Sequence, residues 1–175
     1  MGQVAIHAAS VPMFVTLMNN MNTWLDKAEQ MAKEKKFDSV VLVNARLAPD
    51  MLPLSAQIDI STAWAKNAMY RLAGQTPPDY PSTDANIPAL KARIARALDD
   101  VQSITAKDLE GAGERMVQFN LGPDIKMNMT GSDYLFRVAL PNFYFHVTTC
   151  YDILRHNGLV IGKQDFLMGA FEIPK

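Results

Sequence analysis

The sequence predicts a mainly helical protein, a four-helix bundle with a small β-hairpin before its last helix. Two observations favour this class. Apolar residues recur at spacings of three and four over four long segments, and a short stretch of strict alternation interrupts them once. With 175 residues, of which 49% are hydrophobic and 20% charged, the chain is long enough to bury one sizeable core. We therefore expect residues 1–175 to form a single helical-bundle domain.

The first long helix is expected over residues 10–35. Ser10 is suited to cap its N-terminus, and Pro12 would then fall in the first turn, where a missing N–H is tolerated. Apolar side chains recur along one face at helical spacing, and polar side chains occupy the other face. The apolar set is Phe14, Leu17, Met18, Met21, Leu25, Ala28, Met31 and Ala32.

Two further helices are expected over residues 50–72 and 86–104, the first with Asp50 as its N-cap. Before them, the apolar run at residues 39–47 fits either a short helix or a strand. Residues 75–85 contain three prolines and several turn formers, which predicts a loop over the surface.

A β-hairpin is expected over residues 115–130. Apolar and polar residues alternate through residues 125–129, directly after a Gly-Pro-Asp turn at residues 122–124. Because an isolated hairpin is only marginally stable, it should lean on the helices.

The last helix is expected to begin at Thr130, which can cap it, and to end at Gly158. Nearly every turn carries apolar or aromatic side chains, so this helix should be buried on most sides. Pro141 removes one backbone hydrogen bond and should bend the helix. Asn142 and His146 are spaced four residues apart, so their side chains leave one face of this apolar helix. They are the strongest functional candidates in the sequence.

Composition and charge argue against several classes of function. The formal net charge is -1 and basic residues are scattered, so nothing favours binding to nucleic acid or to an anionic membrane. The single cysteine, Cys150, allows no internal disulfide and no cysteine zinc site. Neither a signal peptide nor an apolar run of bilayer length is visible, so a cytoplasmic location is expected.

Two parts of the sequence resemble a known family. The run LPNFYFHVTTCYDILRHNG at residues 140–158, followed by IGKQDFL at residues 161–167, is similar to the DUF1993 family, and so is ARLAPDMLPLSAQ at residues 45–57. That family resembles a branch of the DinB/YfiT-like superfamily, whose members are regarded as metalloenzymes. The resemblance implies a DinB-like four-helix bundle with a long crossover, often dimeric, so a homodimer is expected.

The resemblance also suggests where a site would lie. DinB-like proteins typically hold a divalent metal with three histidines, one from the second helix and two from an HxxxH pattern ahead of a Leu-Arg-x-x-Gly ending. Residues 154–158 match that ending, which aligns His146 with the second histidine and Asn142 with the first. The remaining position aligns best with Gln57, which by its spacing alone fits either a solvated amide or a group bordering the core. Because amides are poor ligands for zinc or nickel, the resemblance implies a degenerate site with no resident metal and no other cofactor.

The hypothesis that the sequence supports best is a small-ligand-binding or structural bundle. In it, Gln57, Asn142 and His146 form a polar pocket and hydrogen-bond one another, a water or a small ligand.

Two alternatives remain open. One is a metal-dependent enzyme similar to the thiol transferases among DinB relatives, with His146 as the surviving ligand and Asp59 or Asp133 completing the set. A metal-free version would use His146 as a general base. The other is an interaction module, in which the apolar segment 159–175 and the Met-rich first helix form a homodimer face. That segment should either wrap the bundle or join a dimer contact.

Overall fold

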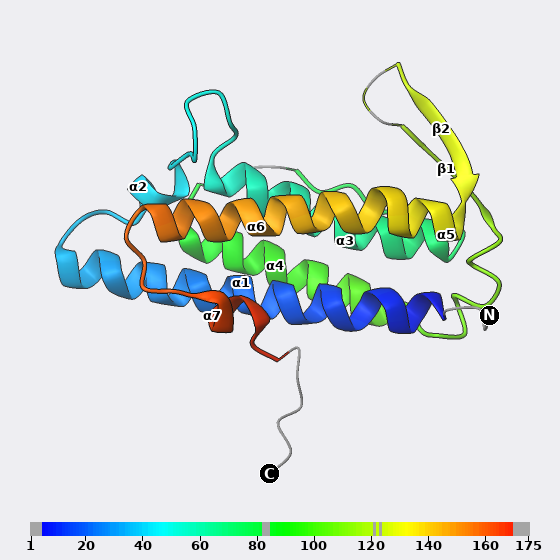
Figure 1. Ribbon diagram of the computed structural model, residues 1–175, viewed down its shortest axis with the longest axis horizontal. Helices are drawn as coiled ribbons and strands as arrows, with labels where there is room; N and C mark the ends of the chain where they lie inside the picture. Colours follow the sequence, from blue (N-terminus) through cyan, green and yellow to red (C-terminus); the bar gives the residue numbers. More distant parts are fainter. Residues whose placement is uncertain (1–4, 82–84, 121, 123, 170–175) are drawn as a thin grey trace, which may run out of the picture.

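The computed structural model describes residues 5–81, 85–120, 122 and 124–169. Four long helices run alongside one another, and a two-stranded hairpin projects from one end of them (Figure 1). The long helices are α1 (Ile6–Lys35), α3 (Leu54–Leu72), α4 (Ile87–Ser103) and α6 (Leu140–His156). The expected bundle with a hairpin before its last helix is therefore confirmed.

Helix α1 begins at Ile6, earlier than expected, so Ser10 is not its N-cap. Ser10 is buried inside the helix, where its hydroxyl donates to the carbonyl oxygen of Ile6 at 2.7 Å. A serine inside a helix can donate to the carbonyl four residues before it. Because Ile6 is buried, the helix begins on the N-terminal side of Ser10, whose capping chemistry is not used. Pro12 consequently lies beyond the first turn. It cannot donate to the carbonyl of Ala8, but both residues are exposed, so water can reach that carbonyl.

Helix α3 begins at Leu54, so the expected N-cap at Asp50 is wrong. The reason is Pro53, which has an extended backbone and disfavours helical geometry at the residue before it. The short run before α3 forms a brief helix, α2 (Val40–Val43), and not a strand.

Helix α4 starts where its sequence predicts. The side-chain oxygen of Asn86 accepts a hydrogen bond from the backbone N–H of Ala89 at 2.9 Å, which satisfies one of the free donors of the first turn. The proline-rich connection before it, described through residue 81, is a loop as expected.

The hairpin pairs β1 (Met116–Asn120) with β2 (Lys126–Thr130) in antiparallel register, with Phe119 opposite Met127. Val117 and Phe119 are buried, and the Phe119 ring lies 4.9 Å from that of Tyr134. The hairpin therefore leans on the last helix, as expected.

The last helix has three parts: α5 (Gly131–Asp133), the π-helical segment η1 (Tyr134–Ala139) and α6. The hydroxyl of Thr130 accepts from the N–H of Asp133, so the expected cap is correct. Within η1, the N–H of Leu140 donates to the carbonyl of Leu135, five residues back. This wider turn directly precedes Pro141, which has no N–H to donate.

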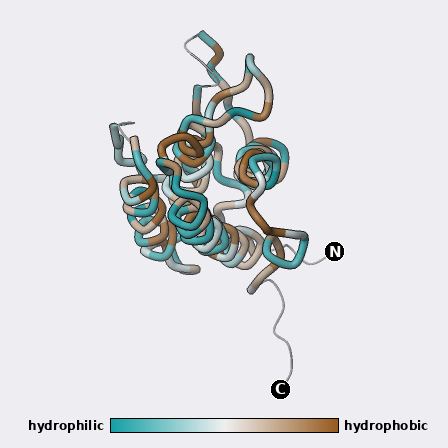
Figure 2. Tube along the Cα trace, turned by 90° about the vertical axis from the view of Figure 1, so that its left-hand side faces the viewer, coloured by the Kyte–Doolittle hydropathy of each residue, from teal (hydrophilic) through white to brown (hydrophobic). Residues whose placement is uncertain are grey.

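The core fills the space between the four long helices. Seen along the bundle, apolar and polar residues tend to occupy different sides of the helices (Figure 2). Phe14 and Phe143 meet edge to face in the core, with ring centroids 4.7 Å apart. No helix in the described ranges is both long enough and apolar enough to cross a membrane.

The C-terminal segment folds back onto α1 through the short helix α7 (Lys163–Leu167). The Phe166 ring stacks on Trp24 at 5.7 Å, and the side-chain amide of Asn20 donates to the carbonyls of Phe166 and Met168. The described part of this segment thus wraps the bundle, the first of the two expected alternatives; residues 170–175 lie outside the described ranges.

Candidate functional site

The structure brings together two of the three residues that the sequence singles out. Gln57 lies on α3 and His146 on α6, and the side-chain oxygen of Gln57 is 2.7 Å from Nδ1 of His146. Gln57 is only 2% exposed, so it belongs to the core and is not a solvated amide. Its Nε2 donates to the carbonyl of Leu52 at 3.1 Å. This second bond fixes which end of the amide faces the imidazole.

The orientation of Gln57 determines the chemistry of His146. An amide oxygen can only accept a hydrogen bond, so Nδ1 of His146 must carry the proton that it donates. Burial lowers the pKa of His146 below its ordinary value, which favours the neutral ring. In that tautomer Nε2 has a free lone pair, and within the described residues it makes no hydrogen bond. His146 can therefore accept a hydrogen bond from another molecule, or a proton.

Asn142, the third expected site residue, is not hydrogen-bonded to this pair. Its side-chain nitrogen donates to the carbonyl of Val138 at 2.7 Å, four residues earlier in the same helix. Because Val138 belongs to the π-helical segment, the amide stabilises the backbone where the helix changes its pitch. Asn142 thus has a local structural contact, on the same helix as His146.

Comparison with known proteins identifies the family of the chain. A family model described as a domain of unknown function, DUF1993, matches residues 6–167. The chain belongs to the DUF1993 family. It is also similar to a DinB family member protein from Shewanella denitrificans, whose crystal structure matches with a TM-score of 0.87 and 34% sequence identity over 97% of this chain and 96% of that one. No protein with a curated description matches the chain. The expected family and DinB-like fold are confirmed, and the family itself carries no established function.

The donor set at the Gln57–His146 pair does not fit a zinc or nickel ion. The oxygen of Gln57 already faces His146, and the amide nitrogen of Asn142 faces a carbonyl, so one imidazole nitrogen remains where such a metal needs several donors. No three His, Cys, Asp or Glu side chains in the described part of the chain are grouped closely enough to hold a metal.

The two carboxylates considered as replacement ligands have cationic partners instead. Asp59 forms an ion pair with Arg93 at 2.7 Å, and Asp133 lies 3.6 Å from Arg137 one turn along its own helix. Each carboxylate therefore lies beside an arginine, and within the described ranges neither belongs to a group of side chains that could hold a metal with His146.

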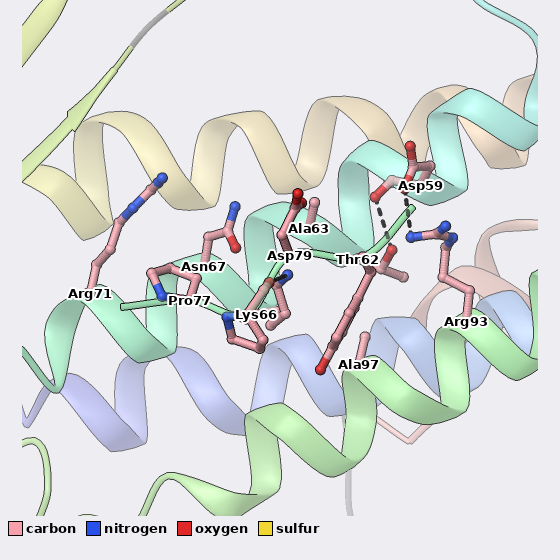
Figure 3. Close-up of a pocket in the computed structure, with 12 residues that line it drawn as sticks. Asp59, Thr62, Ala63, Lys66, Asn67, Arg71, Pro77, Asp79, Arg93 and Ala97 are labelled. Carbon is pink, nitrogen blue, oxygen red and sulfur yellow. Dashed lines mark hydrogen bonds and ion pairs between the residues drawn. The ribbon is translucent and has the colours of Figure 1, made fainter. Parts of the chain in front are cut away.

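A second polar site, which sequence analysis missed, lies between α3, α4 and the loop at residues 77–80 (Figure 3). It encloses a cavity of about 220 Å³. Lys66 is at its centre, only 6% exposed, and its ammonium donates to the carbonyl of Pro78 and lies 4.3 Å from the centre of the Tyr80 ring. Burial is the main cause that lowers the pKa of Lys66.

Most polar groups of this cleft bond to other residues of the chain. The hydroxyl of Tyr80 donates to the carboxylate of Asp100 at 3.0 Å, and the Arg96 guanidinium lies 3.4 Å from the centre of the Tyr80 ring. Arg93 donates to the carbonyl of Pro81. These contacts hold the loop against α3 and α4, so the first role of Lys66 is to anchor that loop. The sequence offered one signal, a lysine next to the apolar stripe of a largely buried helix.

Proposed function

We propose that this DUF1993 protein binds a small molecule at His146, at the position where the resemblance to DinB-like proteins implies a metal. The observation that carries the proposal is the 2.7 Å contact between the oxygen of Gln57 and Nδ1 of His146. It holds the imidazole in one tautomer and directs its remaining lone pair, on Nε2, to whatever occupies the site.

The surroundings of His146 favour an apolar molecule that carries one hydrogen-bond donor. The neighbouring Phe145 is 57% exposed, and its ring meets the imidazole edge to face with centroids 5.2 Å apart. Leu52, whose carbonyl binds Gln57, is also exposed. Exposed apolar side chains beside a neutral acceptor suit an aromatic ligand with an O–H or S–H group.

The binding test uses phenol and benzyl mercaptan as probes, with toluene as the probe that lacks a donor. Nuclear magnetic resonance titration should give saturable shifts of the Phe145 ring signals, which the wild type and His146→Ala share, and of the His146 ring signals in the wild type, with the first two probes. Binding should be much weaker with toluene and should be lost in His146→Ala. The absence of saturable shifts with either donor probe, or equal binding to His146→Ala, would overturn the proposal.

A second test asks whether the position corresponds to the metal site of DinB-like proteins. The variant Gln57→His, Asn142→His restores the three histidines, so it should gain about one equivalent of Zn²⁺ that the added change His146→Ala removes again. Wild-type protein should bind no more Zn²⁺ than its His146→Ala variant. An equivalent of metal held by the wild type and lost in His146→Ala would instead support the metal-dependent enzyme hypothesis.

A further inference from the structure

A larger groove lies between the hairpin and the start of the loop that follows α3. Its volume is about 710 Å³. It shares Arg71 and Pro77 with the Lys66 cleft, so Arg71 stands at the junction of the two cavities. The described part of its lining comes from the end of α3, the loop that follows and both strands of the hairpin.

The lining of this groove is polar and positively charged, although the net charge of the protein is -1. It includes two cations, Arg71 and Lys126, and four primary amides from Gln75, Gln118, Asn120 and Asn128. None of the described lining residues is an aspartate or a glutamate. Positive charge surrounded by amide donors and acceptors favours a polar ligand with a negatively charged group.

Arg71 carries a partly buried positive charge in this groove. Its guanidinium lies 5.7 Å from the centre of the Phe119 ring and 6.0 Å from that of Tyr134. Its Nη1 donates to the hydroxyl of Tyr134 at 3.0 Å. No carboxylate forms an ion pair with it among the residues that the structure describes. Charged groups that lose water are usually paired, and within the described ranges this guanidinium has only the Tyr134 hydroxyl and the rings of Phe119 and Tyr134 beside it.

Tyr134 does not supply the missing negative charge. Burial raises the pKa of its phenol above the ordinary value, although the nearby Arg71 acts in the opposite direction. The phenol is therefore neutral near pH 7 and serves as a hydrogen-bond acceptor that orients the guanidinium. In the close-up of the cleft, Arg71 lies at the opposite end from Asp59 and Arg93, which pair with each other (Figure 3).

We propose that Arg71 binds the oxyanion, a carboxylate or a phosphate, of a small polar molecule seated in the groove between the hairpin and residues 75–77. A guanidinium presents parallel N–H donors that match such an oxyanion, and the Tyr134 hydroxyl holds it in place. The amides of Gln118 and Asn128 recognise hydroxyl or amide groups on the body of the ligand, and Lys126 adds charge at the exposed strand. This site is separate from the one proposed at His146.

The test measures binding of four probes by isothermal titration calorimetry: inorganic phosphate, glucose 6-phosphate, gluconate and, as the neutral control, glucose. We expect saturable binding of at least one polyhydroxylated anion and none of glucose. Arg71→Gln should weaken that binding roughly 10- to 100-fold, the loss expected for a hydrogen-bonded charged partner. Lys126→Gln should weaken it less, and Arg71→Lys should recover part of it, because it keeps the charge without the paired donors.

The matched control is Arg137→Gln, which removes an exposed arginine from the last helix and should leave binding unchanged. Binding of glucose 6-phosphate without gluconate identifies a phosphate ligand, and the reverse identifies a carboxylate. If Arg71→Gln unfolds, the exposed strand variants Lys126→Gln and Asn128→Ala carry the test. The absence of saturable binding of every anion at millimolar concentration, or equal affinity in the folded groove variants, would overturn the proposal.

Discussion

Gln57 and His146 are 89 residues apart in the sequence, and their side chains are joined by a hydrogen bond of 2.7 Å across the bundle. The side-chain oxygen of Gln57 accepts from the imidazole, and the side-chain nitrogen of Gln57 donates to the carbonyl of Leu52. The pair therefore connects α3 to α6 and also holds the imidazole in the tautomer that carries its proton on Nδ1.

Removing the imidazole should destabilise the fold. His146→Ala leaves the buried oxygen of Gln57 without a partner, so we expect a loss of about 1–3 kcal/mol in the free energy of unfolding. Chemical denaturation measures it. His156→Ala, which removes an exposed histidine from the end of the same helix, should cost much less. Wild-type stability in His146→Ala would contradict this view of the pair.

The two side chains should be energetically coupled. In a double-mutant cycle of Gln57→Met and His146→Ala, the double variant should lose less stability than the sum of the single variants, because the second change removes a group that has already lost its partner. We expect a coupling of roughly 0.5–3 kcal/mol from unfolding curves. Additive losses would mean that the contact contributes nothing as a pair.

The stability of the protein should depend on the titration of His146. A histidine in the unfolded chain has a pKa of about 6.5. Burial lowers the pKa of His146 in the folded protein below that value. Between these two pKa values the unfolded chain binds more protons. The contribution of the neutral imidazole is therefore present above the unfolded pKa and is lost as the pH falls through the lowered folded pKa.

His146→Gln removes this titration while keeping an amide donor toward Gln57. From about pH 7.5 to about pH 5.5, its free energy of unfolding should fall less than that of the wild type. His156→Ala keeps His146 and should lose stability as the wild type does. Identical pH dependence in wild type and His146→Gln would contradict the lowered pKa.

The loop over the Lys66 cleft should depend on Tyr80. Tyr80→Phe keeps the aromatic ring near Lys66 and Arg96 but loses the hydrogen bond to Asp100, a cost of about 1 kcal/mol. Faster cleavage of this loop by a protease would report the loss. Thr76→Ala, whose side chain makes no hydrogen bond in the described structure, should be cleaved at the wild-type rate.

Gly131, at the start of the last helix, should not tolerate a side chain. A Cβ atom there would collide with the backbone carbonyl of Ala112, which cannot move away as a flexible side chain could. Gly131→Ala should therefore cost roughly 1–3 kcal/mol or more, measured by thermal unfolding. Gly162→Ala, where a Cβ would meet no atom within 4 Å, is the matched control and should have a small effect.

The sequence predicted the helices and the hairpin well, because their apolar spacing is the main signal of each. It failed at two helix starts, where Ser10 and Asp50 have good capping chemistry. Burial of Ile6 extends α1 past Ser10, and Pro53 delays α3 beyond Asp50. Local capping preferences were outweighed by packing in one case and by a proline constraint in the other.

The contacts at one candidate site could be predicted from the sequence, and those at the other two cavities could not. The proximity of Gln57 and His146 could be predicted, because the resemblance to DinB-like proteins aligns both residues with positions of one site on two helices. The surroundings of Lys66 and Arg71 could not, since they depend on a proline-rich loop and a hairpin that return to α3 from distant parts of the chain. Neither the path of that loop nor the position of the hairpin follows from helical periodicity.

The most direct test of the proposed pair is a long-range ¹H–¹⁵N correlation spectrum of the His146 ring, recorded near neutral pH with and without Zn²⁺. We predict a neutral ring with its proton on Nδ1, a shift of that nitrogen in Gln57→Met, and no change on addition of one equivalent of Zn²⁺. A proton on Nε2, or a ring nitrogen whose signal moves to that of a zinc-bound imidazole, would contradict a hydrogen-bonded pair that binds no metal.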